Sequence, residues 1–267
     1  MARLTLPTAQ LNAALFARWR APLRRSLIAT LDLAFPPDCG FCHAAIDSSK
    51  LGLLCTTCRQ ELLSGPAACP RCGRASSGLS REEANEESCS RCAGLRYPFE
   101  RTLRLAAYEG AMRSAVLRAK RSGERELTMA LGELLAEQMV SMLAPWQPHA
   151  VLAVPMHWTR RVRRGVNSPQ ILARALAAKL GVPVADHVLV RSRRTAPQAS
   201  LSTRERTQNV RGAFQARRHR DLKGARLVLV DDVMTTGATV KEAAKSLRRA
   251  GAEAIHVVVL ARAEELD

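Results

Sequence analysis

Residues 226–251 contain a run of side chains whose types and order suit phosphate chemistry. The apolar residues 227–230 predict a buried strand, and Asp231 and Asp232 follow it directly. The small residues of the next turn allow backbone N–H groups to close around a phosphate, and the helix that follows adds a positive partial charge. Carboxylates are strong acceptors for a sugar diol. The run therefore predicts a site for a sugar phosphate, held from its 5′-phosphate to its ring hydroxyls.

The predicted site consists of the two acids and the turn after them. Its members are Asp231, Asp232, Val233, Met234, Thr235, Thr236, Gly237, Ala238 and Thr239. Asp at a strand end and Thr at a helix start are also common capping devices. Capping accounts for one Asp and one Thr, but not for both acids, three threonines and a glycine in this order. A Walker-type phosphate loop is excluded, because the sequence has no Gly-Lys-Ser/Thr at this place.

The cysteines predict metal binding. All eight form Cys-x-x-Cys pairs, namely Cys39/Cys42, Cys55/Cys58, Cys69/Cys72 and Cys89/Cys92. Two such pairs complete a tetrahedral Zn²⁺ shell, so we expect two closed, structural zinc sites that fold a segment too small for a core of its own. The gaps favour the first pair with the second and the third with the fourth, although crossed pairing stays open. Disulfides are the alternative, which this pattern disfavours in a chain without a secretion signal.

Positive charge gathers in the carboxyl-terminal part of the chain. The net charge is +17, and residues 191–226 hold 11 basic side chains against 2 acidic ones. Such a field favours polyanions, either nucleic acid or a multiply phosphorylated metabolite. A solvated polar surface is the alternative explanation of a charge run. Aromatic residues are only 4% of the chain, so contact with single-stranded DNA should be mainly with phosphates.

Strands and helices alternate in the second half of the sequence. Expected strands are residues 103–110, 151–154, 188–190, 226–230 and 255–260, and expected helices are residues 111–121, 124–143, 168–180 and 239–250. The basic segment after residue 190 has no clear period. This alternation predicts an α/β fold with a mainly parallel sheet that is covered on both faces. Ligands of such folds bind at the carboxyl ends of the strands.

The amino-terminal segment has no small-residue cleavage site, and no apolar run approaches the length of a membrane span. We therefore expect a cytoplasmic protein with no membrane span. An Arg-rich leader can imitate an organellar presequence, and the favoured interpretation is an amphipathic helix that packs on the body.

Residues 228–239 resemble the phosphoribosyl pyrophosphate (PRPP) signature of type I phosphoribosyltransferases. With the cysteine pairs in front, the chain from about residue 35 resembles the ComF family, also called ComFC or GntX-like proteins. Further matching segments are residues 35–37, 108–110, 154–155, 163–167, Gln198 and residues 206–209. The resemblance implies a double zinc ribbon at residues 35–95 and a type I phosphoribosyltransferase-like domain at residues 96–267. Residues 1–34, which precede the matching part, are expected to form a helical extension.

The resemblance also implies a division of labour. Asp231 and Asp232 would hold the ribose hydroxyls, and residues 235–239 the 5′-phosphate. The turn formed by Pro155, Met156 and His157 would approach the pyrophosphate, helped by residues 160–164. The basic segment 191–209, with Arg194 counted as catalytic, would close over the substrate. His157 is a candidate base, although a lone histidine in a loop is more often a hydrogen-bonding bystander.

The implied chemistry is substitution at the anomeric carbon of PRPP, with Mg²⁺ and cationic side chains neutralising the leaving pyrophosphate. No element that reads a nucleobase is recognisable. Type I enzymes use a small hood for this purpose, and the zinc-ribbon segment is the candidate for its place. Two functions stay open: a phosphoribosyltransferase with an unidentified acceptor, and a non-catalytic module that senses PRPP and binds single-stranded DNA. The resemblance links both to natural transformation and the DNA-uptake machinery.

Overall fold

A computed structural model of the chain describes residues 38–46, 52–76, 89–92, 94–156, 167–193, 195, 202–217 and 222–264. The chain divides into two compact units, Met1–Cys55 and Thr56–Asp267, and each is described by itself. The helical extension expected at residues 1–34 lies outside the described residues. The domain boundaries expected at residues 35 and 96 stay predictions.

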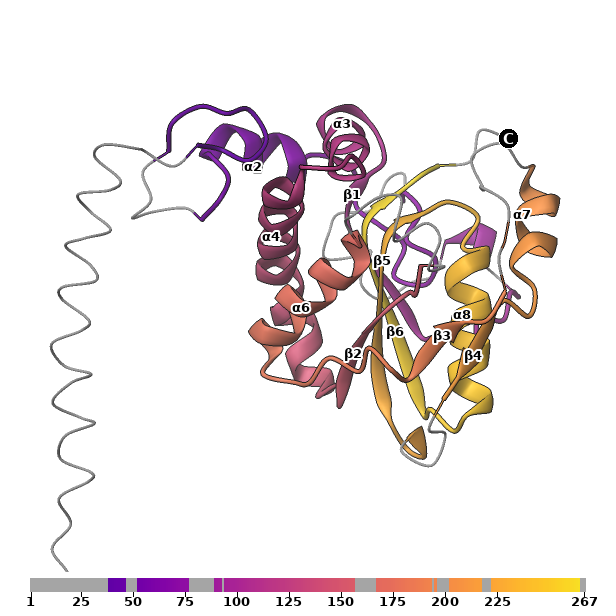
Figure 1. Ribbon diagram of the computed structural model, residues 1–267. Helices are drawn as coiled ribbons and strands as arrows, with labels where there is room; N and C mark the ends of the chain where they lie inside the picture. The colour runs from indigo at the N-terminus through magenta and orange to yellow at the C-terminus, as the bar shows by residue number, and fades with distance from the viewer. Residues whose placement is uncertain are drawn as a thin grey trace, which may run out of the picture. The chain divides into compact units, whose positions relative to one another are not determined.

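A four-stranded parallel sheet forms the centre of the larger unit (Figure 1). In spatial order its strands are β1 (Arg101–Ala107), β6 (Ala254–Arg262), β5 (Arg226–Met234) and β2 (Ala150–Ala153). The two inner strands, β5 and β6, have the near-continuous Val- and Leu-rich runs that suit strands buried on both faces. The predicted parallel sheet is confirmed, and β5 lies in its interior as its apolar run indicated.

Helices cover both faces of this sheet. They are α3 (Gly110–Ala119), α4 (Arg125–Leu143), α6 (Ser168–Leu180) and α8 (Ala238–Arg249). In Figure 1, α4 and α6 lie on one side of the sheet and α8 lies on the other. The predicted strands and helices correspond to observed ones, and most ends agree within one or two residues. The exceptions are β1, which ends at Ala107 and not at residue 110, and β5, which continues through both acids to Met234.

The basic segment that showed no period contains two short elements. The helix α7 (Thr203–Val210) begins with a capping box, in which Ser202 Oγ accepts from the Glu205 backbone N–H and the Glu205 carboxylate accepts from the Ser202 N–H. Ser-x-x-Glu is a sequence signature of a helix start, so the signal for α7 was present in the sequence. The strand β4 (Phe214–Ala216) pairs antiparallel with β3 (Leu189–Arg191) and is too short to show a period.

Within the described residues, Arg125–Trp146 is long and apolar enough to cross a membrane by length and composition. It comprises α4 and the 3-10 turn η3 (Ala144–Trp146). However, 56% of its most apolar window is buried inside the protein, where α4 contacts α6. Core helices pass the same test, so this helix is weak evidence for a span.

The segment between residue 56 and β1 packs on the sheet through residues that the structure describes. It contains α2 (Thr56–Leu63) and the 3-10 turn η2 (Ser90–Cys92). The Thr102 backbone N–H donates to the Pro70 carbonyl at 2.7 Å, and Thr102 Oγ1 donates to the Arg71 carbonyl at 3.1 Å. Gly73 has a φ of 71°, and a Cβ at this position would lie 2.8 Å from Thr102 Cγ2. Both its conformation and the close approach therefore require glycine.

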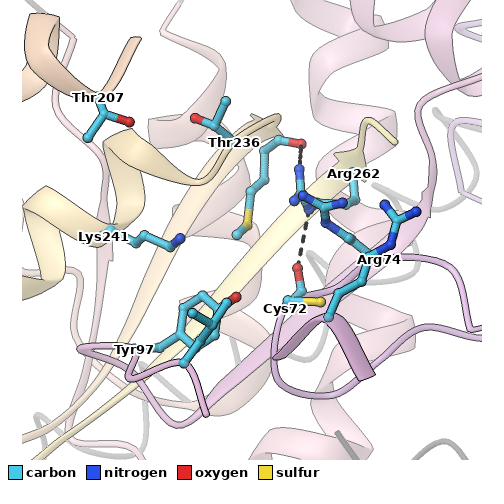
Figure 2. Close-up of a pocket in the computed structure, with 10 residues that line it drawn as sticks. Cys72, Arg74, Tyr97, Thr207, Thr236, Lys241 and Arg262 are labelled. Atoms are coloured by element: carbon cyan, nitrogen blue, oxygen red, sulfur yellow. Dashed lines mark hydrogen bonds between the residues drawn. The ribbon is translucent and has the colours of Figure 1, made fainter. Parts of the chain in front are cut away.

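Arg262, at the end of β6, joins this segment to the carboxyl end of β5. The residue is 2% exposed. Its Nε donates to the Cys72 carbonyl at 3.2 Å, and its Nη1 donates to the Met234 carbonyl at 3.1 Å (Figure 2). Nη1 also donates to the Ala263 carbonyl at 3.0 Å. These carbonyls satisfy buried N–H groups that would otherwise be costly. One side chain therefore holds three backbone segments together.

We expect Arg262→Met to lower the free energy of unfolding by about 2–4 kcal/mol, because the carbonyls of Cys72 and Met234 lose a donor in a buried site. Urea unfolding measures this change. The matched control is Arg249→Met, at a side chain that is 71% exposed, and it should shift stability by no more than about 0.5 kcal/mol. An Arg262 variant as stable as this control would contradict the structural role given to Arg262.

Candidate functional site

The predicted phosphate turn, residues 235–239, joins β5 to the start of α8. Gly237 precedes α8 with a φ of 75°, and a Cβ there would lie 2.6 Å from Met234 Cε. Glycine is therefore required both by conformation and by space. Thr236 Oγ1 accepts a hydrogen bond from the Ala238 N–H at 3.1 Å, where α8 begins. The turn thus lies against the N-terminus of a 12-residue helix, whose N–H groups and dipole favour an anion.

Asp231 and Asp232 stand just before this turn. Asp231 is 9% exposed, and its Oδ1 accepts from the Asp232 N–H at 2.9 Å. Asp232 Oδ1 in turn accepts from the Val233 N–H at 2.7 Å. Burial, and after it the charge of Asp232, raises the pKa of Asp231 well above its ordinary value. A buried carboxyl group with a raised pKa, such as that of Asp231, is typical of a functional site.

Two cations face the acids. Lys120, directly after α3, has its Nζ 3.4 Å from Asp232 Oδ2. Arg191, the last residue of β3, hydrogen-bonds to Thr195 Oγ1, and its guanidinium lies 5.2 Å from the centre of the Phe214 ring. The charges of Lys120 and Arg191 lower the pKa of Asp231 in opposition to the larger effect of burial. The sequence did not indicate Lys120, because its place depends on how α3 packs against the sheet.

The turn expected to approach the pyrophosphate lies beside the acids. Pro155 and Met156 follow β2, and the Val154 N–H donates to the Val230 carbonyl at 2.8 Å, which continues the pairing of β2 with β5. Pro155 and Met156 therefore share one edge of the sheet with Asp231.

Other members of the predicted site are placed differently or lie outside the described residues. His157, Arg194 and residues 160–166 are not among the residues that the structure describes. Arg193 donates to the carbonyls of Asn209 at 2.9 Å and Arg211 at 2.8 Å. Arg193 thus ties the basic segment to the end of α7.

The cysteines form two groups of four. They are Cys39, Cys42, Cys55 and Cys58, and Cys69, Cys72, Cys89 and Cys92, and within each group the sulfur atoms all lie within 4.8 Å of one another. This confirms the order of pairing that the gaps favoured. All eight cysteines are described, and all are free thiols, so the disulfide alternative is wrong for this structure. The two groups share a local design, since a Cys N–H donates to a Cys Sγ at 3.3 Å in each, from Cys55 to Cys39 and from Cys89 to Cys69.

The sulfur positions fit zinc. Four sulfur atoms about 2.3 Å from a tetrahedral Zn²⁺ are about 3.8 Å apart. The observed separations include 3.7 Å between Cys42 and Cys55, 3.9 Å between Cys69 and Cys92, and 3.7 Å between Cys72 and Cys89. The geometry therefore suits two Cys₄ zinc sites.

The thiols of the second group differ in acidity. The side-chain hydrogen bond with Cys72 lowers the pKa of Cys69 to about 4, whereas burial raises the pKa of Cys92 to about 11. A divalent cation lets all four sulfurs act as thiolates together.

A cavity of about 490 Å³ lies beside the phosphate turn (Figure 2). Its walls come from separate parts of the chain. Cys72 of the second cysteine group, the nearby Arg74 and Tyr97 come from the segment before β1, and Thr236, Lys241 and Arg262 come from the turn, α8 and β6. The sequence did not predict this cavity, because its lining residues are far apart in the sequence. It lies where the second cysteine group meets the phosphate turn.

Comparisons with known proteins agree with this arrangement. Residues 163–266 match the phosphoribosyl transferase domain, and residues 30–93 match the double zinc ribbon domain. DNA utilization protein YhgH of Salmonella typhimurium is 31% identical over 233 residues, which cover 86% of this chain and 99% of that protein. Competence protein F of Haemophilus influenzae is 30% identical over 229 residues, which cover 84% of this chain and 96% of that protein.

A solved structure is also similar in part. The glutamine PRPP amidotransferase from B. subtilis, complexed with ADP and GMP, aligns with 49% of this chain and 25% of its own, at 26% identity and a TM-score of 0.34. The two domain matches confirm the expected phosphoribosyltransferase-like fold and support zinc in the cysteine groups. Because relatives of at least 30% identity align over nearly their whole length, the chain belongs to the ComF family, with a double zinc ribbon followed by a phosphoribosyltransferase domain.

Proposed function

We propose that this protein binds PRPP at the carboxyl end of β5 and transfers its phosphoribosyl group to an unidentified acceptor. The observation that carries the proposal is the acid pair itself. Asp231 is buried beside Asp232, directly before a glycine-closed turn at the N-terminus of α8. A ligand that presents both hydroxyls and a phosphate satisfies these two unlike parts at once.

Each part of the site has a distinct task in this proposal. The turn at Thr235–Thr239 would hold the 5′-phosphate, where the N-terminus of α8 favours negative charge. Asp231 and Asp232 would accept hydrogen bonds from the ribose hydroxyls. Lys120, at 3.4 Å from Asp232, holds one carboxylate in place and offsets its charge. The ring is thereby fixed between a phosphate anchor and a diol anchor, which orients the anomeric carbon.

The reaction breaks the bond between the anomeric carbon and pyrophosphate and forms a bond from that carbon to the acceptor. Positive charge develops on the sugar, and negative charge develops on the leaving oxygen. Carboxylates are the oxygen donors that Mg²⁺ takes together with substrate phosphates, so the acid pair fits this ion. Mg²⁺ bound with PRPP would supply charge that stabilises the leaving pyrophosphate. The carboxylates of Asp231 and Asp232 would lie near the sugar and stabilise its positive charge.

The second candidate is a non-catalytic module that senses PRPP and binds single-stranded DNA. It is favoured by the basic side chains around α7, of which Arg204, Arg211 and Arg217 are exposed. Such residues suit phosphate contacts with steep salt dependence and little sequence preference. Because YhgH and Competence protein F are named for DNA utilization and competence, we place either activity in the cytoplasmic handling of incoming DNA.

Calorimetry with PRPP, with and without Mg²⁺, tests the proposal. We expect the double variant Asp231→Asn, Asp232→Asn to weaken PRPP binding by about tenfold or more, because two charge-assisted hydrogen-bond acceptors are lost. The control is Asp186→Asn, which changes a carboxylate that pairs with Arg174 away from the site. Absence of PRPP binding to the unaltered protein at millimolar ligand would remove the foundation of both candidates.

Pyrophosphate release separates the two candidates. The enzyme should release pyrophosphate from PRPP in the presence of Mg²⁺ and fractionated small-molecule extract, and the double acid variant should not. Intact PRPP and DNA binding with no release in any fraction would favour the sensing module instead.

The acid pair also predicts how stability depends on pH. Because the pKa of Asp231 is raised in the fold, its protonated form favours folding, and this contribution is lost as the pH rises through the raised pKa. Asp231→Asn removes the cost of ionising a buried group. We expect its melting temperature to exceed that of the unaltered protein by roughly 2–4 °C near pH 8, with a smaller gain at lower pH. Thermal melts across pH measure this, and a gain independent of pH would contradict the assignment.

A further inference from the structure

The cavity beside the phosphate turn contains positive charge that the proposed PRPP site does not use. Its lining includes Arg74, Arg91, Lys241 and Arg262, and none of the lining residues that the structure describes is acidic. Arg262 is committed to three carbonyls, which accept its hydrogen bonds without cancelling its charge. A concave surface of one sign concentrates the opposite sign, so the cavity attracts anions.

The charges face the cavity from two sides. Arg74 lies two residues after Cys72, and Arg91 lies directly before Cys92, so both flank the second cysteine group. Lys241 lies in the first turn of α8. In Figure 2, Lys241 points toward Tyr97, and its Nζ lies 4.7 Å from the centre of that ring. Because the second cysteine group is fastened to the sheet through Arg262 and Thr102, these charges are held by rigid elements.

The donor set suits a phosphate monoester. Arginine offers a planar fork that binds two phosphate oxygens, and lysine adds a point charge. The hydroxyls of Thr207 and Thr236 line the same cavity, and Tyr97 and Met234 give it an apolar part. Its volume of about 490 Å³ is typical of sites for small molecules. The cavity therefore matches a ligand with one strongly charged end and a less polar body.

The cavity is separate from the acids. Asp231, Asp232 and Lys120 do not belong to its described lining, whereas Thr236 of the phosphate turn does. The cavity thus shares Thr236 with the turn but not the acids that would hold the ribose. We infer that the cavity is a second anion site, in which Arg74 and Arg91 beside the second cysteine group bind the phosphate monoester of a second substrate. This inference rests on the proposed function, because only a transferase needs a second substrate beside PRPP.

A phosphate monoester reaches the cavity from either of two sources. One is a free nucleotide, and the other is the 5′-phosphorylated end of a single strand. Both present the same dianion, so the experiment uses both as probes and compares the strand with its unphosphorylated form.

The test uses the full, zinc-loaded chain and the variant Arg74→Gln, Arg91→Gln. The control, Arg113→Gln, Arg249→Gln, removes the same charge from exposed positions on α3 and α8 that do not line the cavity. Calorimetry measures binding of dAMP, of a short 5′-phosphorylated oligodeoxynucleotide, and separately of PRPP with Mg²⁺. We expect the variant Arg74→Gln, Arg91→Gln (the ribbon variant) to weaken monoester binding by about tenfold or more, and the control variant to weaken it by no more than about twofold. PRPP affinity should change by no more than about twofold in both, which also shows that the variants are folded.

A third variant, Lys241→Gln, removes charge from the opposite wall and should weaken the same probes without loss of PRPP binding. Preference for the phosphorylated strand over dAMP would identify a strand end as the source, and preference for dAMP a free nucleotide. Equal binding of phosphorylated and unphosphorylated strands, with none of dAMP, would overturn the inference. An equal loss of PRPP affinity in the ribbon variant would also overturn it, by making the cavity part of the PRPP site. Failure of the unaltered chain to bind PRPP is a different result, which contradicts the proposed function.

Discussion

The buried guanidinium of Arg262 fixes the relation between the zinc ribbon and the phosphate turn. It binds the carbonyl of Cys72 in the second cysteine group and that of Met234, the last residue of β5. The turn begins at the next residue, so the metal-binding segment and the phosphate turn share one anchor. A charge in such a site has a large desolvation cost, and its several carbonyl partners offset it. The cavity lies between the zinc ribbon and the phosphate turn because Arg262 holds these two segments together.

The remaining parts of the site come from elements that are far apart in the sequence. Parallel pairing of β2 with β5 puts Pro155 beside Asp231, and the end of α3 supplies Lys120 to Asp232. Burial and the charge of Asp232 disfavour the ionised form of Asp231 and raise its pKa, and the charges of Lys120 and Arg191 only partly oppose this. Stability is thus lower in the free protein at the place where the proposed ligand binds, a common relation in functional sites.

The sequence was informative where the chemistry is local. The acids, the glycine and the threonines are contiguous, and the Cys-x-x-Cys pairs need only short turns. The place of the acids and the turn between a strand and a helix could therefore be predicted, and so could the pairing of the cysteines. The alternation of apolar runs likewise placed the strands within a few residues. Lys120, Arg262 and the cavity could not be predicted, because their roles depend on long-range packing that no nearby residue encodes. The helix α7 was missed although its capping box, Ser202 to Glu205, is visible in the sequence.

The most direct test of the joint between ribbon and turn is the affinity for PRPP after the loss of one zinc site or the other. Cys89→Ser removes a ligand of the second group, and Cys55→Ser removes the corresponding ligand of the first. Since Arg262 binds a carbonyl of the second group, we expect Cys89→Ser to weaken PRPP binding by about tenfold or more. Calorimetry should find PRPP affinity nearly unchanged in Cys55→Ser. Equal PRPP affinities in the two variants and the unaltered protein would contradict the role of Arg262 as a link between the second cysteine group and the phosphate turn.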